Sequence, residues 1–168
     1  EGWRALEAGA ADRAAAELRR LAAFHGEQGP PQARLWAEAF ANLAPEILAY
    51  ETTRAQTWRP VVLEGPFTFS FDALAAWLRT VDPAAAVADL PATLPRVPVE
   101  GTIDRIDIAR DGSARAVVID FKTGHAAAVR DVRDGVEIQV PLYALAVEMG
   151  AVGGLPPRAD GAPWQIDH

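Results

Sequence analysis

The residues of this chain that could do chemistry cluster in two short segments, 101–107 and 119–124. The second segment contains Lys122, the only lysine among sixteen basic side chains. Lysine is a compact ammonium group whose pKa shifts on burial, whereas arginine is a wide planar fork with a very high pKa. A site that needs a small cation beside a carboxylate cannot exchange one for the other. Lys122 is therefore the first candidate functional residue.

Two aspartates are placed to share a site with this lysine. Asp120 and Lys122 are two residues apart in an expected strand, so they project to the same face. Asp111-Gly112, between this strand and the preceding one, is a strong hairpin signal. If the hairpin pairs the two strands, Asp104 lies close to Asp120. The result is two carboxylates and one ammonium group on one face of a sheet.

Such a trio has a clear chemical use. Neighbouring carboxylates repel each other unless they are protonated or bridged by a cation. Their oxygens suit Mg²⁺ or Mn²⁺. A metal can lower the pKa of a bound water, and a nearby lysine can neutralise charge in the transition state. The pattern fits phosphodiester hydrolysis.

A simpler interpretation is that these residues are surface charges. Asp104, Arg105 and Asp107 would then face solvent with an ordinary ion pair, and Asp120 with Lys122 would form another. Exposed pairs of this kind are common and contribute little to stability. Spacing alone slightly favours this interpretation.

Three motifs, in order and with compatible gaps, favour the site. They are Gly101-Thr102-Ile103-Asp104-Arg105-Ile106-Asp107, Ile119-Asp120-Phe121-Lys122-Thr123-Gly124 and Gln139-Val140-Pro141-Leu142-Tyr143-Ala144. This part of the chain, residues 100–146, resembles the RecB-type nuclease domain of the PD-(D/E)XK superfamily. That family reads G-x-x-D-R-I-D, then D-[YF]-K-T-G, then Q-x-x-x-Y on a helix.

The resemblance implies a role for each matching position. Asp104 and Asp120 would bind Mg²⁺ or Mn²⁺, with the backbone carbonyl of Phe121 as a further ligand. Lys122 would be the catalytic lysine.

Two helical residues and one strand residue complete the candidate site. Gln139 and Tyr143, one helical turn apart on one face, would touch DNA phosphate or steady the lysine. Without the resemblance, the residues alone favour Tyr143 as a core aromatic and Gln139 as its polar neighbour. Glu64, on an earlier strand, is either a third carboxylate of the metal site or a solvated edge charge, and the two readings have similar weight.

The implied function is metal-dependent cleavage of DNA, expected to be exonucleolytic, within a larger recombination or repair protein. A helicase domain or subunit would be the partner. One alternative is a catalytically inactive module of the same fold, kept for DNA binding or complex assembly. Another is an unrelated metal-dependent phosphohydrolase. The G-x-x-x-H histidine helix of many members is missing. Because the chain starts at Glu1 in helix-like sequence, we expect it to be a piece of a longer polypeptide that need not be active alone.

Composition limits the other possibilities. The 168 residues include no cysteine, which excludes disulfides, cysteine-bound zinc and an iron–sulfur cluster within the chain. A net charge of −7 argues against binding nucleic acid through a broad basic surface. No stretch approaches the ~20 apolar residues of a membrane span. We expect a cytoplasmic protein without membrane contact.

The residue pattern predicts helices, three mostly antiparallel strands and a last helix. With the resemblance, this order implies an α/β fold with a restriction-endonuclease-like core, in which helices flank a small mixed β-sheet. We expect one nuclease-like domain over 1–168, with a helical part (1–56), a sheet part that includes the Gln/Tyr helix (57–149) and an irregular tail (150–168). The expected helices are 3–24, 32–56 with a kink or restart at Pro45, 72–79 and 136–149, and the expected strands are 61–71, 97–109 and 114–122. Residues 80–98 read as a connection.

Side-chain alternation gives each strand an expected apolar face. In the first strand Val61, Leu63 and Phe67 share one face, while Val62 and Glu64 share the other. In the last strand the side chains opposite Asp120, including that of Phe121, are expected to bury against helices.

Overall fold

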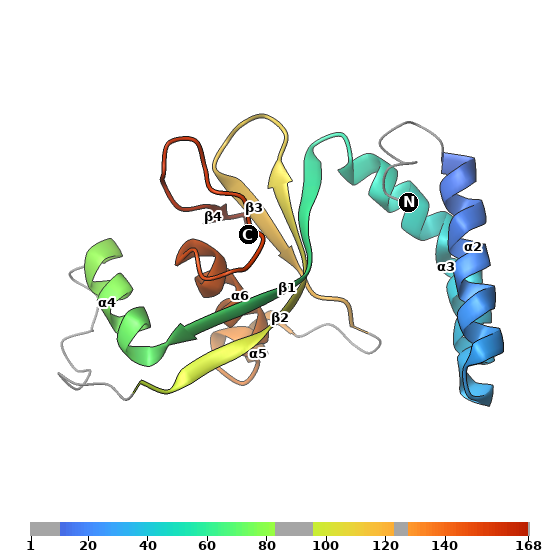
Figure 1. The fold of residues 1–168 in the computed structure, drawn as a ribbon, viewed down its shortest axis with the longest axis horizontal. Coiled ribbons are helices and arrows are strands. Elements are labelled where there is room, and N and C mark those ends of the chain that lie inside the picture. Colours follow the sequence, from blue (N-terminus) through green and yellow to red (C-terminus); the bar gives the residue numbers. More distant parts are fainter. Residues whose placement is uncertain (1–10, 83–95, 123–127, 168) are drawn as a thin grey trace. The chain divides into compact units, whose positions relative to one another are not determined.

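The computed structural model describes residues 11–82, 96–122 and 128–167 (Figure 1). The chain forms two compact units, Glu1–Arg59 and Pro60–His168. No helix in the described ranges is both long enough and apolar enough to cross a membrane.

The first unit is a pair of helices, α2 (Ala11–Gln28) and α3 (Pro31–Arg54), which pack side by side (Figure 1). Helix α2 continues past Gly26, where the sequence predicted a break. A Cβ atom on Gly26 would lie 2.8 Å from the Cβ of Ala37, so this glycine permits close helix packing. Helix α3 also runs through Pro45 without a break, so of the expected kink or restart the restart is wrong.

The strand β1 (Trp58–Ser70) leads directly into helix α4 (Phe71–Val81). Buried and exposed side chains alternate along β1, and the alternation shifts by one residue at Glu64. The φ of Glu64 is 51°, in the left-handed region. After this point Phe67 and Phe69 are buried as predicted, but before it Val62 is buried and Leu63 is 66% exposed. The expected buried face of the first half of the strand is therefore wrong. A strict two-residue period cannot show a backbone irregularity of this kind.

Three further strands complete a four-stranded sheet in the order β1-β2-β3-β4. They are β2 (Pro98–Ala109), β3 (Arg115–Ile119) and β4 (Gln165–Ile166). Strands β2 and β3 are antiparallel, joined through the predicted turn at Asp111-Gly112, and β4 pairs parallel to β3. This mixed sheet with flanking helices confirms the expected restriction-endonuclease-like α/β class.

The last strand corrects the expectation for the tail. Residues 150–168 were predicted to be irregular, yet Gln165 and Ile166 pair with Arg115 and Ala116 of β3. A strand of two residues is too short to produce a readable alternation.

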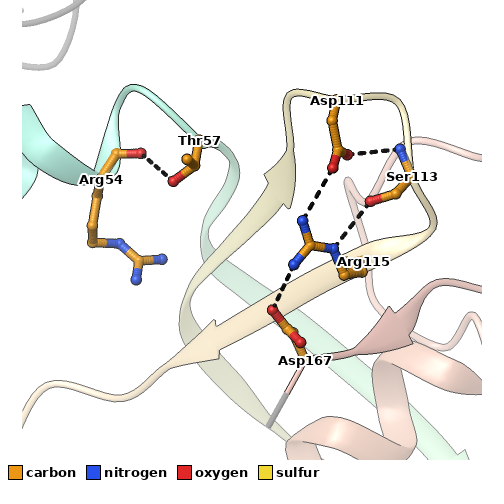
Figure 2. Close-up of polar contacts among 6 residues, drawn as sticks. All are labelled: Arg54, Thr57, Asp111, Ser113, Arg115 and Asp167. Carbon is orange, nitrogen blue, oxygen red and sulfur yellow. Dashed lines mark hydrogen bonds and ion pairs between the residues drawn. The ribbon is translucent and has the colours of Figure 1, made fainter.

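A polar cluster joins this closing strand to the β2–β3 turn, as Figure 2 shows. The guanidinium of Arg115 contacts the carboxylates of Asp111 at 3.1 Å and Asp167 at 3.2 Å, and its Nε donates to Ser113. Asp111 also accepts the backbone N–H of Ser113. These contacts hold the pKa of Asp111 down at about 2, chiefly through the hydrogen bonds with Ser113.

The helix α6 (Gln139–Glu148) follows a short helix, α5 (Val129–Arg133). It starts later than the predicted residue 136, because a turn after Asp134-Gly135 takes up the intervening residues. The carboxylate of Glu137 accepts the N–H of Gln139 at 3.0 Å. Pro141 is tolerated, as predicted, because it lies in the first turn, where backbone N–H groups have no partner within the helix.

The other end of α6 is also fixed. Gly150, with a φ of 68°, donates to the carbonyl of Val147, and Ala151 donates to the carbonyl of Ala146. This is a Schellman motif, which a glycine in the left-handed conformation favours. The chain then crosses to β1, where Val152 bridges Phe67.

The core of the second unit lies between this helix and the sheet. Tyr143 packs its ring edge-on against Phe67, with 5.6 Å between the centroids. The buried cluster combines residues of α6 with residues of the strands, namely Val62, Phe67, Phe69, Ile103, Ile106, Ile108, Ala116, Tyr143, Ala146, Val147 and Val152. Helix α6 thereby has its N-terminal turn close to the end of β3.

Candidate active site

The β2–β3 register sets the position of the two aspartates. Arg105 pairs with Ile119, so the next position outward aligns Asp104 with Asp120. Residues aligned in this way project to the same face of a sheet. Strand β3 ends at Ile119, so Asp120 and Lys122 lie just beyond its last pair.

The backbone beyond β3 is held by one of these carboxylates. Asp104 Oδ2 accepts the backbone N–H of Phe121 at 2.6 Å. This bond continues the connection between β2 and the chain after β3, although the strand itself has ended. It fixes the residue between Asp120 and Lys122.

The lysine forms an ion pair with its neighbouring aspartate. Lys122 Nζ lies 2.8 Å from Asp120 Oδ2, and the side chain of Asp120 is 8% exposed while that of Lys122 is 38% exposed. The hydrogen bond to Asp120 raises the pKa of Lys122, and the charges of Asp120 and Glu137 act in the same direction, against partial desolvation. Lys122 is therefore an ammonium group at neutral pH. It can donate hydrogen bonds and offset negative charge, but it cannot take up a proton.

The amide of Gln139 joins the members of the site. Its Oε1 accepts from Lys122 Nζ. Its Nε2 donates to Asp120 Oδ1 at 3.2 Å and to the Tyr143 hydroxyl at 2.6 Å. One side chain from the first turn of α6 therefore fixes both the carboxylate and the ammonium group at the end of β3.

The donor set is compatible with a divalent cation. Asp104 and Asp120 offer carboxylate oxygens, and the carbonyl of Phe121 lies between them and Lys122 in sequence. Over the described ranges, no group of three or more His, Cys, Asp or Glu side chains is placed to hold a metal. Mg²⁺ does not need such a cage, because it keeps several waters and is usually bound through one or two carboxylates.

The structure thus brings together five of the predicted residues: Asp104, Asp120, Lys122, Gln139 and Tyr143. Glu64 is exposed on β1, and no described contact joins it to them. Thr123 and Gly124 of the second motif lie outside the described residues.

The surface-charge interpretation is wrong for Arg105 and Asp107, which do not face solvent. Arg105 and Asp107 are 5% and 0% exposed and form a two-pronged ion pair with distances of 2.6 and 2.9 Å. The side chain of Asp120 is 8% exposed, and it forms the ion pair with Lys122 that this interpretation expected.

Phe121 departs from its expected place and adds an unexpected contact. Its side chain, expected to bury against helices, is 64% exposed, since it lies past the paired part of β3. Its backbone N–H was not anticipated as a partner of Asp104. No side-chain pattern carries a signal for such a backbone donor.

Comparison with known proteins gives one result. A family profile described as the PD-(D/E)XK nuclease superfamily matches residues 3–168, which includes residues of both units. Neither the curated proteins nor the solved structures contain a significant match.

Proposed function

Since the chain belongs to the PD-(D/E)XK nuclease superfamily, we propose that it is a RecB-type nuclease domain that hydrolyses DNA phosphodiester bonds with Mg²⁺ or Mn²⁺. The observation that carries this proposal is the contact of Lys122 with both Asp120 and Gln139 at the end of β3. We further propose exonuclease action within a recombination or repair protein, with a helicase domain or subunit as its partner.

Asp104, Asp120 and the carbonyl of Phe121 would hold the metal. The bound ion would supply a water of lowered pKa and positive charge for the phosphate oxygens. Asp104 also accepts the N–H of Phe121, so the same carboxylate orients the backbone whose carbonyl would be the third ligand. Glu64 stays a candidate for a further carboxylate.

Lys122 would act on the substrate as a fixed ammonium group. Its partners hold it at the edge of the site, where it would donate to a phosphate oxygen or orient the attacking water. Fixed charges of this kind stabilise a transition state because they need no reorganisation during the reaction.

Gln139 and Tyr143 would position this lysine rather than contact the DNA. Both polar atoms of the Gln139 amide are engaged with Asp120, Lys122 and Tyr143. These contacts support the steadying role over the phosphate-contact role.

Cleavage of end-labelled linear DNA tests the proposal. Single- and double-stranded substrates are incubated with Mg²⁺, with Mn²⁺ and with a chelator, beside Lys122→Ala and Asp120→Ala. We expect metal-dependent cleavage by the wild type and its loss in both variants. Arg79→Ala, an exposed change on α4, should retain activity.

The same assay separates the rival functions. Unchanged cleavage in Lys122→Ala and Asp120→Ala rejects this site. DNA binding without cleavage under every metal condition favours a catalytically inactive module of the same fold.

A further inference from the structure

A cavity of about 400 Å³ lies at the end of α6 opposite Gln139. We call it the tryptophan cavity, because Trp77 of α4 and Trp164 before β4 both line it, together with Leu155, Pro156, Glu148 and Arg158. Its volume is within the range of roughly 300–1,000 Å³ that is usual for small-ligand sites, which are typically apolar and aromatic with a few polar groups. None of these residues takes part in the candidate active site.

The polar groups of the tryptophan cavity are held in place. The indole N–H of Trp164 donates to the carbonyl of Pro156 at 2.9 Å, which fixes the ring plane. The guanidinium carbon of Arg158 lies 5.4 Å from the centre of the Trp164 ring. The side chain of Arg158 is only 15% exposed.

Charge in the cavity favours a neutral occupant. Arg158 is paired with Asp160 through Nε, at 2.9 Å, and through Nη2, and the acidic residue Glu148 also lines the cavity. A phosphate would meet Glu148 and an arginine that is already paired. A flat neutral group with hydrogen-bonding edges could instead stack on an indole, accept from Nη1 of Arg158 and donate to Glu148.

We propose that the tryptophan cavity binds one unpaired base of the DNA substrate. Aromatic side chains bind single strands by stacking on bases, a contact that every base can make. A base within a duplex is covered by its neighbours and must leave the stack to enter a pocket. The cavity therefore selects DNA with a single-stranded segment.

The position of the cavity suits such a substrate. Gln139 begins α6 and Glu148 ends it, so at a rise of 1.5 Å per residue the two ends are about 14 Å apart. A strand whose phosphate lies at Lys122 would place a base a few nucleotides away in the cavity. This inference rests on the proposed nuclease function for its choice of ligand, but the base-binding site itself can be tested without cleavage.

Binding of a fluorescein-labelled thymidine octanucleotide, measured in chelator by fluorescence anisotropy, tests the proposal. The comparison ligand is a labelled abasic oligomer with the same number of phosphates. We expect the thymidine oligomer to bind the wild type more tightly than the abasic oligomer. Trp77→Ala and Trp164→Ala should each weaken thymidine binding by about 5- to 150-fold, the range of base–aromatic stacking, without changing abasic binding.

Two further variants keep the result interpretable. Trp164→Phe retains an aromatic face and should lose less affinity than Trp164→Ala. Phe71→Ala removes an aromatic side chain of α4 that is 42% exposed and does not line the cavity, so it should bind as the wild type does. Far-ultraviolet circular dichroism verifies the fold of each variant.

Three results would overturn the base-binding site: no thymidine binding by the wild type, equal binding of the two oligomers, or full binding by a folded Trp77→Ala. Failure of the proposed function is a different result. In that case the base preference is present, and metal-dependent cleavage by the wild type is not.

Discussion

At the scale of single residues, the site depends on the size of the Lys122 ammonium group. Its nitrogen contacts both Asp120 and the Gln139 amide oxygen. An arginine would carry the same charge, but its planar fork is wider and would displace the amide that joins helix α6 to Asp120. A change of shape at constant charge is therefore enough to disturb the arrangement.

The charge state of this lysine can be measured directly, because the chain contains no other lysine. In ¹³C-lysine-labelled, chelator-treated protein, we expect the single Cε resonance to titrate above the ordinary lysine pKa of about 10.4. The pKa is raised on folding, so the stabilising ion pair is fully present below the ordinary value and is lost as pH rises through the raised one. Asp120→Asn, which removes the main cause, should return the midpoint toward the ordinary value. A wild-type midpoint below the ordinary lysine pKa would contradict the ion pair of Lys122 with Asp120.

The backbone of Glu64 predicts an unusual order of variant stabilities. A β-branched residue is strained at a φ of 51°, whereas glycine is not, so we expect Glu64→Val to be less stable than Glu64→Gly by about 1–2 kcal/mol in urea unfolding. Thr68 is an exposed position of the same strand with an ordinary backbone. There the order of stability should reverse, with Thr68→Val more stable than Thr68→Gly. Equal stability of the two Glu64 variants would contradict the left-handed conformation.

The sequence could predict the side chains of the site but not all of its atoms. The three motifs singled out Asp104, Asp120 and Lys122, and the turn signal at Asp111-Gly112 correctly paired β2 with β3. The expected strand over 114–122 was too long, because β3 ends at Ile119 and leaves Asp120 and Lys122 beyond it. The bond from the Phe121 N–H to Asp104 could not be foreseen, because every residue except proline offers the same donor. The phase change at Glu64 was hidden because glutamate carries no sequence signal for a positive φ.

At the scale of elements, the site depends on how the ends of α6 and β3 are held. At the start of helix α6 the carboxylate of Glu137 accepts the N–H of Gln139, and the glycine motif closes its end. Strand β3 is flanked by β2 and by the short closing strand β4. The cluster around Arg115 connects β4 to the β2–β3 turn (Figure 2).

Removing this connection should loosen the closing strand. In Arg115→Ala we expect the backbone amides of Gln165 and Asp167, which donate to Ala114 and Ala116, to exchange roughly two- to five-fold faster with deuterium. The expected increase in exchange rate is modest because exposed ion pairs contribute little to stability. The amide of Gly153, bonded to Pro66, should keep its rate, and Arg79→Ala serves as the control variant. Unchanged exchange at Gln165 and Asp167 would show that β4 does not depend on Arg115.

Element types were predictable where the periodic pattern was long, and boundaries were not. The hairpin was predicted from the Asp111-Gly112 signal, and in the structure Gly112 adopts a φ of 78°, which glycine favours. Helix α2 was expected to stop at Gly26, yet that glycine faces Ala37. The sequence does not distinguish a glycine that ends a helix from one that lets two helices approach.

At the scale of the whole molecule, the acidic balance restricts how DNA can bind. The chain carries a net charge of −7. Exposed arginines near the start of α6 are paired with adjacent acids, as in Arg130 with Asp131 at 3.7 Å and Arg133 with Asp134 at 3.4 Å. The charges of Arg130 and Arg133 are therefore already offset by neighbouring acids.

This charge balance predicts that the affinity for DNA depends only weakly on the salt concentration. For a thymidine oligomer in chelator, we expect the slope of log affinity against log salt to lie between 0 and about −2, as for at most about three phosphate contacts on single-stranded DNA. Titrations at several sodium chloride concentrations measure it. A slope steeper than about −4 would reveal a basic surface that the charge distribution does not predict.

The central claim is that a compact ammonium group at position 122 is required for metal-dependent DNA cleavage. The most direct measurement compares the Mg²⁺-dependent cleavage rate of the wild type with that of Lys122→Arg, using Arg79→Lys as a matched control for the exchange of cation type. The predicted result is a loss of roughly 100-fold or more in Lys122→Arg, as for removal of a transition-state donor, with the fold intact and the control fully active. Cleavage by Lys122→Arg at the wild-type rate would contradict the claim.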